Sequence, residues 1–260
     1  MIPGFLKRWR RRRLRARPFP AAWKSIIARN VPIFRRLPAE DQAELCQHIQ
    51  VFLAEKYFEG CGGLEITDEI RLTIAAHASL LLLHRPTDYY PQLVTILIYP
   101  SAYITQEDRY LGNNIWEEGP DGLLGHTAPR MGSLVLAWDE AKRGAAEQAD
   151  GTNLILHEFA HQLDFEDSET DGVPLLEGRP EYQSWARIMS REFEKLRAEE
   201  EAGTPTVLDT YGATNPAEFF AVATEAFFER SRALRAKKPE LYEQLRRFFR
   251  QDPAAIPARQ

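Results

Sequence analysis

The chain is organised around the stretch Thr152-Asn-Leu-Ile-Leu-His-Glu-Phe-Ala-His-Gln-Leu-Asp164. None of its residues breaks a helix, and apolar side chains surround the polar ones, so it predicts a helix. Asp150 or Thr152 could cap the N-terminus of that helix. His157 and His161 are four residues apart and therefore lie on one face, roughly 6 Å apart along the axis. Such a pair can direct two ring nitrogens at one ion.

The pattern His-Glu-x-x-His within this stretch predicts a zinc site. Imidazole nitrogens suit a tetrahedral Zn²⁺ ion, at about 2.0–2.1 Å each. Glu158 can reach a metal-bound water without ligating the metal, and is its natural base. The alternative is an exposed helix with three ordinary polar residues. Because the helix is mostly apolar, burying His and Glu without partners would be costly, so the pattern favours one zinc ion per chain.

A catalytic zinc site usually has three protein ligands and a water, so a further ligand must come from elsewhere. Asp164 follows His161 by three residues and is too far along the helix to share the metal. We expect Asp164 to be the hydrogen-bond partner of a ligating histidine instead.

A better candidate for the third ligand lies in the segment 211–229. Asn215 is predicted to cap a helix that begins at Pro216, and Glu218 then occupies the third helical position. At that position Glu218 could equally be the reciprocal glutamate of a capping box, so the pattern leaves cap and ligand open. Two weaker alternatives follow on a similar face, Glu225 and Glu229.

Two stretches together resemble the Mlc titration factor A family of bacterial zinc peptidases: His157-Glu-Phe-Ala-His-Gln-Leu-Asp164 and Tyr211-Gly-Ala-Thr-Asn-Pro-Ala-Glu-Phe-Phe-Ala221. The second is also similar to the metal-binding helix of the anthrax lethal factor catalytic domain. The likeness covers nearly the whole chain, from Pro18-Phe-Pro-Ala-Ala-Trp23 to Arg250-Gln-Asp-Pro253.

The resemblance implies a mostly helical, zincin-like α+β metallopeptidase domain with a small mixed sheet beside the motif helix. It implies that His157, His161 and Glu218 hold one Zn²⁺, with Glu158 as the base. Tyr211 would face the scissile carbonyl; the alternative is a turn aromatic packed beside its neighbouring glycine.

The implied activity is hydrolysis of a peptide or protein substrate, of aminopeptidase type, and the implied partner is an Mlc-like transcriptional repressor of sugar-uptake genes. A rival hypothesis is a binding protein that sequesters such a repressor, with peptidase activity secondary. The presence of Glu158 favours an enzyme, because a pure binding module has no need of that base.

Composition sets further bounds. A hydrophobic content of 44% over 260 residues is enough for a real core. Cys46 and Cys61 do not make a disulfide scaffold and, without a secretion signal, predict a reducing cytoplasm. The net charge of −5 argues against nucleic-acid binding by the protein as a whole. No apolar run approaches the about 18 residues that a membrane helix needs.

The positive charge is concentrated near the N-terminus, in Lys7, Arg8, Arg10, Arg11, Arg12, Arg13, Arg15 and Arg17. Pro18-Phe-Pro20 follows, where a signal peptide would need an apolar stretch. We expect residues 1–17 to form a basic arm folded on an acidic surface of the same protein; the alternative is a contact with nucleic acid or an anionic membrane. Residues 18–260 are expected to form one domain, with a helical part at 18–90 and a catalytic part at 91–260.

The remaining pattern gives the expected elements of this α+β domain. Helices are expected at 23–28, 37–57, 68–84, 180–200 and 240–249, and strands at 65–67, 93–99, 101–105 and 133–138. The strand 133–138, shortly before the motif helix, suits a shelf on which a peptide adds as a further strand. The segment 113–125 holds turns, His126 is a weak site candidate, and His77 is expected to be a core histidine.

Overall fold

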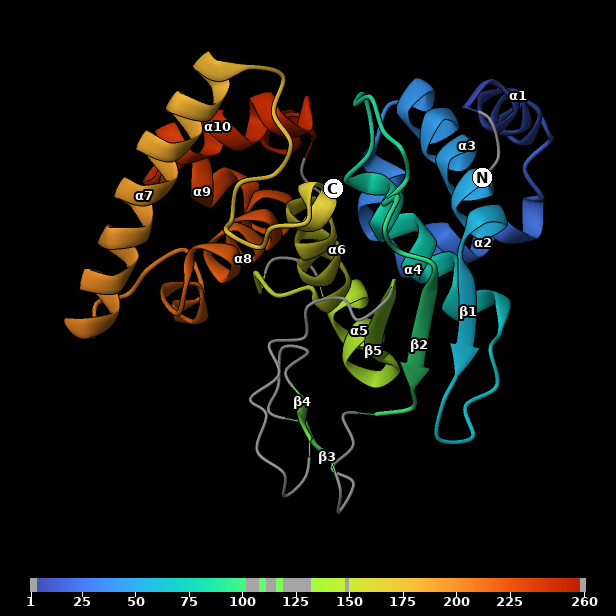
Figure 1. Ribbon diagram of the computed structural model, residues 1–260, viewed down its shortest axis with the longest axis horizontal. Coiled ribbons are helices and arrows are strands. Elements are labelled where there is room, and N and C mark those ends of the chain that lie inside the picture. The colour runs from blue at the N-terminus through green and yellow to red at the C-terminus, as the bar shows by residue number, and fades with distance from the viewer. Residues whose placement is uncertain (1–3, 102–107, 111–115, 119–131, 148–149, 258–260) are drawn as a thin grey trace.

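The computed structural model describes residues 4–101, 108–110, 116–118, 132–147 and 150–257. In these residues the protein is mostly helical, with a small sheet beside the central helices (Figure 1). The helices are α1 (Gly4–Arg15), α2 (Ala21–Asn30), α3 (Ala39–Glu55), α4 (Asp68–Leu80), α5 (Trp138–Ala146), α6 (Leu154–Asp164), α7 (Arg179–Glu201), α8 (Pro216–Glu229), α9 (Ser231–Lys237) and α10 (Pro239–Phe249). The strands are β1 (Tyr57–Gly60), β2 (Thr95–Tyr99), β3 (Asp108–Tyr110), β4 (Trp116–Glu118) and β5 (Ser133–Ala137), and short 3₁₀ turns stand at Pro32–Arg36, Phe165–Asp167, Thr210–Ala213 and Pro253–Ala255.

The main sheet has three strands in the order β1-β2-β5, and both pairings are parallel. Parallel neighbours need a long connection, and here α4 stands between β1 and β2 in the chain. The strands β3 and β4 pair antiparallel in a separate ladder. The α+β class is therefore confirmed, but the expected mixed sheet is wrong: parallel and antiparallel pairs occur in two different sheets.

The helix α6, which carries the His-Glu-x-x-His pattern, lies at the centre of the molecule. It contacts α4 and α5 on one side and α8 on another, and it also touches β5. The neighbouring α4 is buried nearly all round, because its side chains face α2, α3, α5 and α6. Thr67 caps α4 by accepting a hydrogen bond from the Ile70 N–H. This packing gives α6 a rigid setting.

His77 on α4 is a core histidine, as predicted. It is buried, and its Nδ1 lies 2.9 Å from the carbonyl oxygen of Thr73. Burial lowers the pKa of His77 to about 4, so the ring is neutral at physiological pH.

The C-terminal half is held together by aromatic side chains. Trp185 of α7 packs edge-on against Phe220 of α8 and Phe248 of α10. The Trp185 ring N–H also donates to the carbonyl oxygen of Gly172, at 2.9 Å. This bond ties the loop that follows α6 to the helices α7, α8 and α10.

The predicted helices are all present, but the helix expected at 37–57 ends at Glu55 and the helix expected at 68–84 ends at Leu80. The strands expected at 93–99 and 133–138 are present as β2 and β5, whereas residues 65–67 form no strand and β1 was not expected. The strand expected at 101–105, the turns at 113–125 and His126 lie wholly or largely outside the described residues. Among the described residues, no helix combines the length and the apolar character that a membrane crossing requires.

Candidate metal centre

The motif helix α6 begins with a cap that the sequence pattern assigned to the wrong residue. Asn153, rather than Asp150 or Thr152, accepts the hydrogen bond from the Leu156 N–H, at 3.1 Å. Asp150 instead accepts from the Thr152 N–H at 3.0 Å and closes the turn before the helix. The cap fixes the first turn of α6 and with it the direction of His157, one turn later.

The second helix of the site, α8, begins as predicted. Asn215 accepts a hydrogen bond from the Glu218 N–H at 3.0 Å, and Pro216 is the first helical residue. Because α8 packs along α6, the Glu218 side chain meets the histidines of a segment about sixty residues earlier.

Three side chains meet at the contact between α6 and α8. The Nε2 atom of His157 lies 3.0 Å from Oε2 of Glu218 and 3.2 Å from Nε2 of His161. The Nε2 atom of His161 lies 3.4 Å from the same Glu218 oxygen. All three atoms lie within 4.8 Å of one another, so these residues form a group that could hold a metal ion.

The chemistry and the spacing of the three atoms fit a tetrahedral zinc ion. Bonds of 2.0–2.1 Å to such an ion place neighbouring ligand atoms about 3.3 Å apart. The observed separations of 3.0, 3.2 and 3.4 Å are close to that value. Two imidazoles and one carboxylate also form a common donor set of catalytic zinc sites, which leaves the fourth position for water or substrate.

The partner of His157 is a residue that the sequence analysis assigned differently. Glu225, two turns after Glu218 on α8, places Oε1 2.7 Å from Nδ1 of His157. Its other oxygen accepts from the Asn153 N–H at the start of α6. With Nδ1 engaged by a carboxylate, Nε2 is turned toward Glu218 and left to ligate. The spacing of seven residues from Glu218 was the only signal in the sequence.

Asp164 is not that partner. It is completely buried, and its Oδ2 accepts from the Gly172 N–H at 2.9 Å, so it holds the loop after α6. Glu229 lies beside the cap of α6, where its Oε1 accepts from the Asn153 side-chain amide at 3.0 Å. Both carboxylates support α6 rather than joining the group of His157, His161 and Glu218.

The surroundings of the site lower the pKa of Glu218 and raise the pKa of Glu158. Burial alone would raise the pKa of Glu218, but hydrogen bonds from His157 and His161 lower it to about 2. Burial lowers the pKa of His157, but Glu225 and Glu218 together raise it well above its ordinary value. Burial raises the pKa of Glu158 to about 7, and the two nearby histidines oppose that shift.

Tyr211 lies beside the three residues rather than among them. Its ring centroid is 6.3 Å from that of His157, and its backbone N–H donates to Asp209, which caps the short 3₁₀ turn. Tyr211 and His157 line the same cavity of about 270 Å³. Among the described residues that line this cavity, carboxylates outnumber guanidinium groups. The carboxylates are Glu140, Asp150, Asp209 and Glu225, and the guanidinium is that of Arg143.

Comparison with known proteins gives one family over almost the whole chain. The family described as glucose-regulated metallo-peptidase M90 matches residues 6–250. An uncharacterized protein of Synechocystis is 41% identical over 249 residues, which cover 94% of this chain and 89% of the relative. Mlc titration factor A of Pectobacterium atrosepticum is 30% identical and that of Serratia proteamaculans 28% identical, and each alignment covers 90% of this chain. These alignments cover 87% and 88% of those two relatives.

Proposed function

Because the chain belongs to the glucose-regulated metallo-peptidase family M90 and resembles Mlc titration factor A, we propose that it is a zinc peptidase of zincin-like fold. His157, His161 and Glu218 would hold the zinc ion. The observation that carries this proposal is the spacing of their three ligand atoms, which matches one tetrahedral ion.

A bound zinc ion would lower the pKa of a water molecule and polarise the scissile carbonyl. Glu158 accepts the proton of the attacking water and delivers it to the leaving amine. Burial raises the pKa of Glu158, which favours the protonated form that it takes between the two steps. Glu225 fixes the ring of His157 through the hydrogen bond at Nδ1, and Tyr211, whose ring centre lies 6.3 Å from that of His157, would donate its hydroxyl to the carbonyl oxygen.

Two features support a peptide substrate with a free amino terminus. The strand β5 is at an edge of the described sheet and contacts α6, so a peptide can add beside it through main-chain hydrogen bonds. The cavity beside His157 and Tyr211 has an excess of carboxylates, which attracts a cationic group. These observations favour aminopeptidase-type hydrolysis.

The test compares the wild type with Glu158→Gln. The amide keeps the size of the side chain but removes the base, so turnover of short chromogenic peptides should fall by roughly two to four orders of magnitude. Zinc content, measured by plasma mass spectrometry, should stay near one ion per chain. The matched control is Glu169→Gln, an exposed glutamate of the loop after α6, which should leave turnover unchanged. Equal turnover of the wild type and Glu158→Gln would refute the assigned mechanism.

A second proposal rests on the name of the relatives, Mlc titration factor A. The chain would then bind an Mlc-like repressor through a surface that does not need catalysis. A purified repressor should bind the wild type and Glu158→Gln with equal affinity in calorimetry. Tight binding of the repressor together with no turnover of any peptide by the zinc-loaded wild type would favour the binding protein over the enzyme.

A further inference from the structure

An open cavity of about 600 Å³ lies between α1, α3 and the segment 85–89. Among the described residues that line it there is no carboxylate. The charged or titratable lining residues are Arg8, Arg11, Arg12, Arg15, His48, Arg85 and Tyr89. Five guanidinium groups around one cavity produce a strongly positive local potential in a protein whose net charge is −5.

The arginines converge because of helical spacing. Arg11 and Arg12 lie three and four residues after Arg8 and four and three residues before Arg15, so the four side chains share one stripe of α1. Arg85 approaches from the segment after α4, on the other side of the cavity. The sequence pattern of the basic arm predicted a charged block, but it did not predict this convergence.

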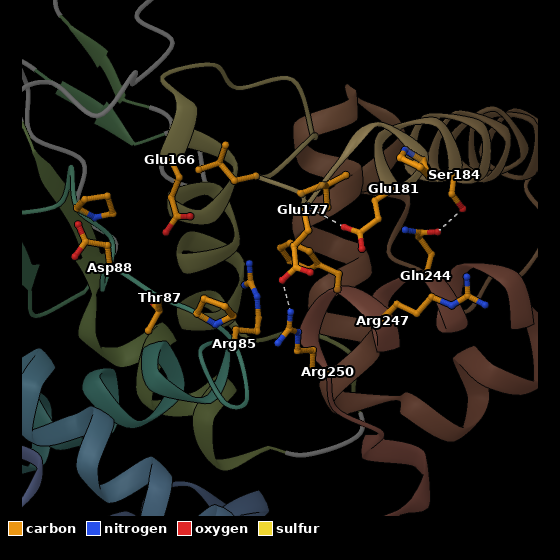
Figure 2. Close-up of a pocket in the computed structure, with 16 residues that line it drawn as sticks. Arg85, Thr87, Asp88, Glu166, Glu177, Glu181, Ser184, Gln244, Arg247 and Arg250 are labelled. Atoms are coloured by element: carbon orange, nitrogen blue, oxygen red, sulfur yellow. Dashed lines mark hydrogen bonds and ion pairs between the residues drawn. The ribbon is translucent and has the colours of Figure 1, made fainter. Parts of the chain in front are cut away.

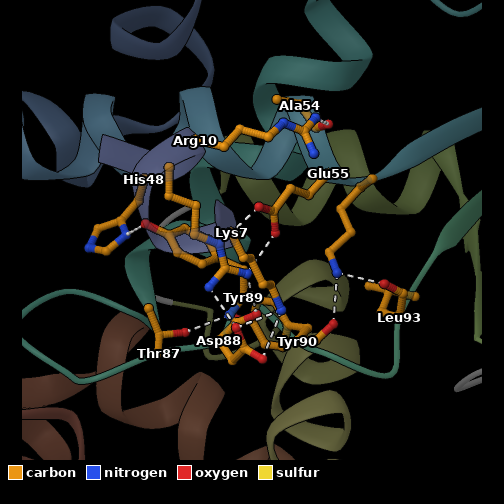
Figure 3. Close-up of polar contacts among 12 residues, drawn as sticks. Lys7, Arg10, His48, Ala54, Glu55, Thr87, Asp88, Tyr89, Tyr90 and Leu93 are labelled. Carbon is orange, nitrogen blue, oxygen red and sulfur yellow. Dashed lines mark hydrogen bonds and ion pairs between the residues drawn. The ribbon is translucent and has the colours of Figure 1, made fainter. Parts of the chain in front are cut away.

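Specific contacts hold α1 in place, and Figure 3 shows them. Arg11 donates to both carboxylate oxygens of Glu55, at 2.8 and 2.7 Å, and to Asp88 at 2.6 Å. Lys7 also bonds Asp88, at 2.9 Å, and the Arg11 guanidinium lies 4.6 Å from the centre of the Tyr89 ring. These contacts match the expected packing of the arm on an acidic surface, and they make the cavity a preformed site.

The other arginines of the cavity make no direct ion pair with a carboxylate of the described residues, although Glu166 and Glu177 act on Arg85 from a distance. In the described part of the chain, Arg8 and Arg12 make no ion pair, and the buried Nε of Arg15 has no hydrogen-bond partner. The Arg85 guanidinium stacks on the Phe248 ring at 3.9 Å and makes only a long hydrogen bond, 3.5 Å, to a backbone carbonyl. Arg15 and Arg85 are half-buried, and half-buried guanidinium groups without a directly paired carboxylate are costly, so a bound anion would offset that cost.

A second cavity, of about 670 Å³, shows the contrast (Figure 2). It also includes Arg85, but Asp88, Glu166, Glu177 and Glu181 line it too. Its Arg250 is already paired with Glu177. Three arginines and four carboxylates are among the residues that line that cavity, so it has no excess of positive charge, in contrast to the cavity beside α1.

We propose that the arginine cavity beside α1 binds a phosphate group, carried either by a soluble phosphate compound or by an anionic lipid headgroup. A phosphate offers several acceptor oxygens at once, which the planar forks of several arginines can bind together. The cavity volume lies within the usual range for small-ligand sites. The outer face of α1 exposes Phe5, Leu6 and Trp9, and arginines beside exposed aromatic residues are typical of helices that lie on a lipid surface.

The experiment uses the zinc-loaded full-length protein and two probes. Inorganic pyrophosphate is titrated by calorimetry, and vesicles of phosphatidylglycerol in phosphatidylcholine are tested by co-sedimentation. The variant Arg8→Gln with Arg12→Gln removes two exposed, unpaired arginines of the cavity and should weaken binding at least tenfold. The control Arg13→Gln with Arg17→Gln removes the same charge from exposed positions outside the lining and should change binding less than twofold.

Binding of pyrophosphate without vesicles identifies a soluble phosphate compound, and binding of vesicles alone identifies a lipid headgroup; both outcomes support the site. Citrate, a carboxylate of similar charge, should bind at least tenfold more weakly than pyrophosphate. Three results would each overturn the proposal: equal losses in the two double variants, equal binding of citrate and pyrophosphate, or no saturable binding of either probe at millimolar concentration.

Discussion

Glu218 has two duties at the start of α8. Its backbone N–H bonds the cap residue Asn215, while its carboxylate faces His157 and His161. The sequence left cap and ligand as alternatives because the position in the helix is the same for both. In the structure the two roles are compatible, because the capping hydrogen bond uses the Glu218 backbone N–H and the carboxylate is free to face the histidines.

Glu218→Gln should separate the two duties. The backbone bond to Asn215 stays, so the helix should form normally, but a neutral amide is a poorer ligand than a carboxylate. We expect zinc affinity to fall by at least one to two orders of magnitude, comparable at least to the loss of a supporting hydrogen bond at a metal site. Competition with a chelator of known affinity measures the change. Full zinc affinity and full turnover in Glu218→Gln would show that another group completes the site.

Glu225→Gln tests the hydrogen bond between Glu225 and Nδ1 of His157. Both Glu225 oxygens accept hydrogen bonds, from His157 Nδ1 and from the Asn153 N–H, and an amide has only one acceptor oxygen. Zinc affinity should therefore fall about 10- to 100-fold. Glu229→Gln is the matched control, because Glu229 Oε1 accepts a hydrogen bond from the Asn153 side chain and so contacts the same cap of α6. That variant should keep its zinc affinity, and equal losses in both variants would show that the cap of α6, rather than His157, explains the effect.

At the scale of elements, the helices were predictable and the relations between elements were not. The helices predicted at 180–200 and 240–249 agree with α7 and α10 to within one residue at each end, because apolar periodicity and flanking prolines are local signals. The cap of α6 was missed because three candidates stand close together, and the turn closed by Asp150 leaves Asn153 as the cap. Whether neighbouring strands run parallel or antiparallel depends on the path of the connections between them, and no local sequence pattern indicates that path.

The same reasoning explains which parts of the candidate site could be predicted. His157 and His161 belong to one helix, so their spacing alone brings them together. Glu225 reaches His157 only because α8 packs along α6 in one particular register. The residues that support the metal ligands are brought together by tertiary packing, so the sequence alone could name them only as alternatives.

The loop after α6 provides a pH-dependent test of that element. Burial raises the pKa of Asp164 to about 6, above its ordinary value of 3.8, although the bond from Gly172 opposes the shift. The stabilising contribution of Asp164 is therefore fully present below pH 3.8 and is lost as pH rises through about 6. A shift of about two units corresponds to about 3 kcal/mol.

Asp164→Asn removes this titration and can keep the acceptor for the Gly172 N–H. We expect the stability of the variant, relative to the wild type, to improve by up to about 3 kcal/mol between pH 4 and pH 8. Melting temperatures across that range measure the trend. Glu169→Gln, which removes an exposed carboxylate of the same loop, should track the wild type at every pH. Parallel curves for wild type and Asp164→Asn would contradict the assigned pKa.

At the scale of the whole molecule, one hydrophobic core runs from Leu14 of α1 to Ala254 near the C-terminus. The basic arm was expected to fold on an acidic surface of the same protein; α1 does so and in addition contributes Leu14 to that core. We retain residues 18–260 as the proposed peptidase domain, with 18–90 as its helical part and 91–260 as its catalytic part. The arm then acts as a support that packs on α3, on the far side of the molecule from α8 (Figure 1).

Deleting residues 1–17 should therefore lower stability while leaving the chemistry intact. The deletion removes the buried Leu14 side chain and leaves Glu55 and Asp88 without Arg11. The free energy of unfolding should fall by an amount on the order of 2–4 kcal/mol, from one buried apolar side chain and the ion pairs of Arg11. For a chain of this size the melting temperature should fall by roughly 5–15 °C. Peptide turnover at 25 °C should stay within a few-fold, because the residues of the metal centre lie on α6 and α8, and the described contacts of α1 are with α3 and the segment before β2. A loss of turnover above tenfold with zinc retained would show that the arm acts on the metal centre, whereas an unchanged melting temperature would show that its packing on α3 contributes nothing.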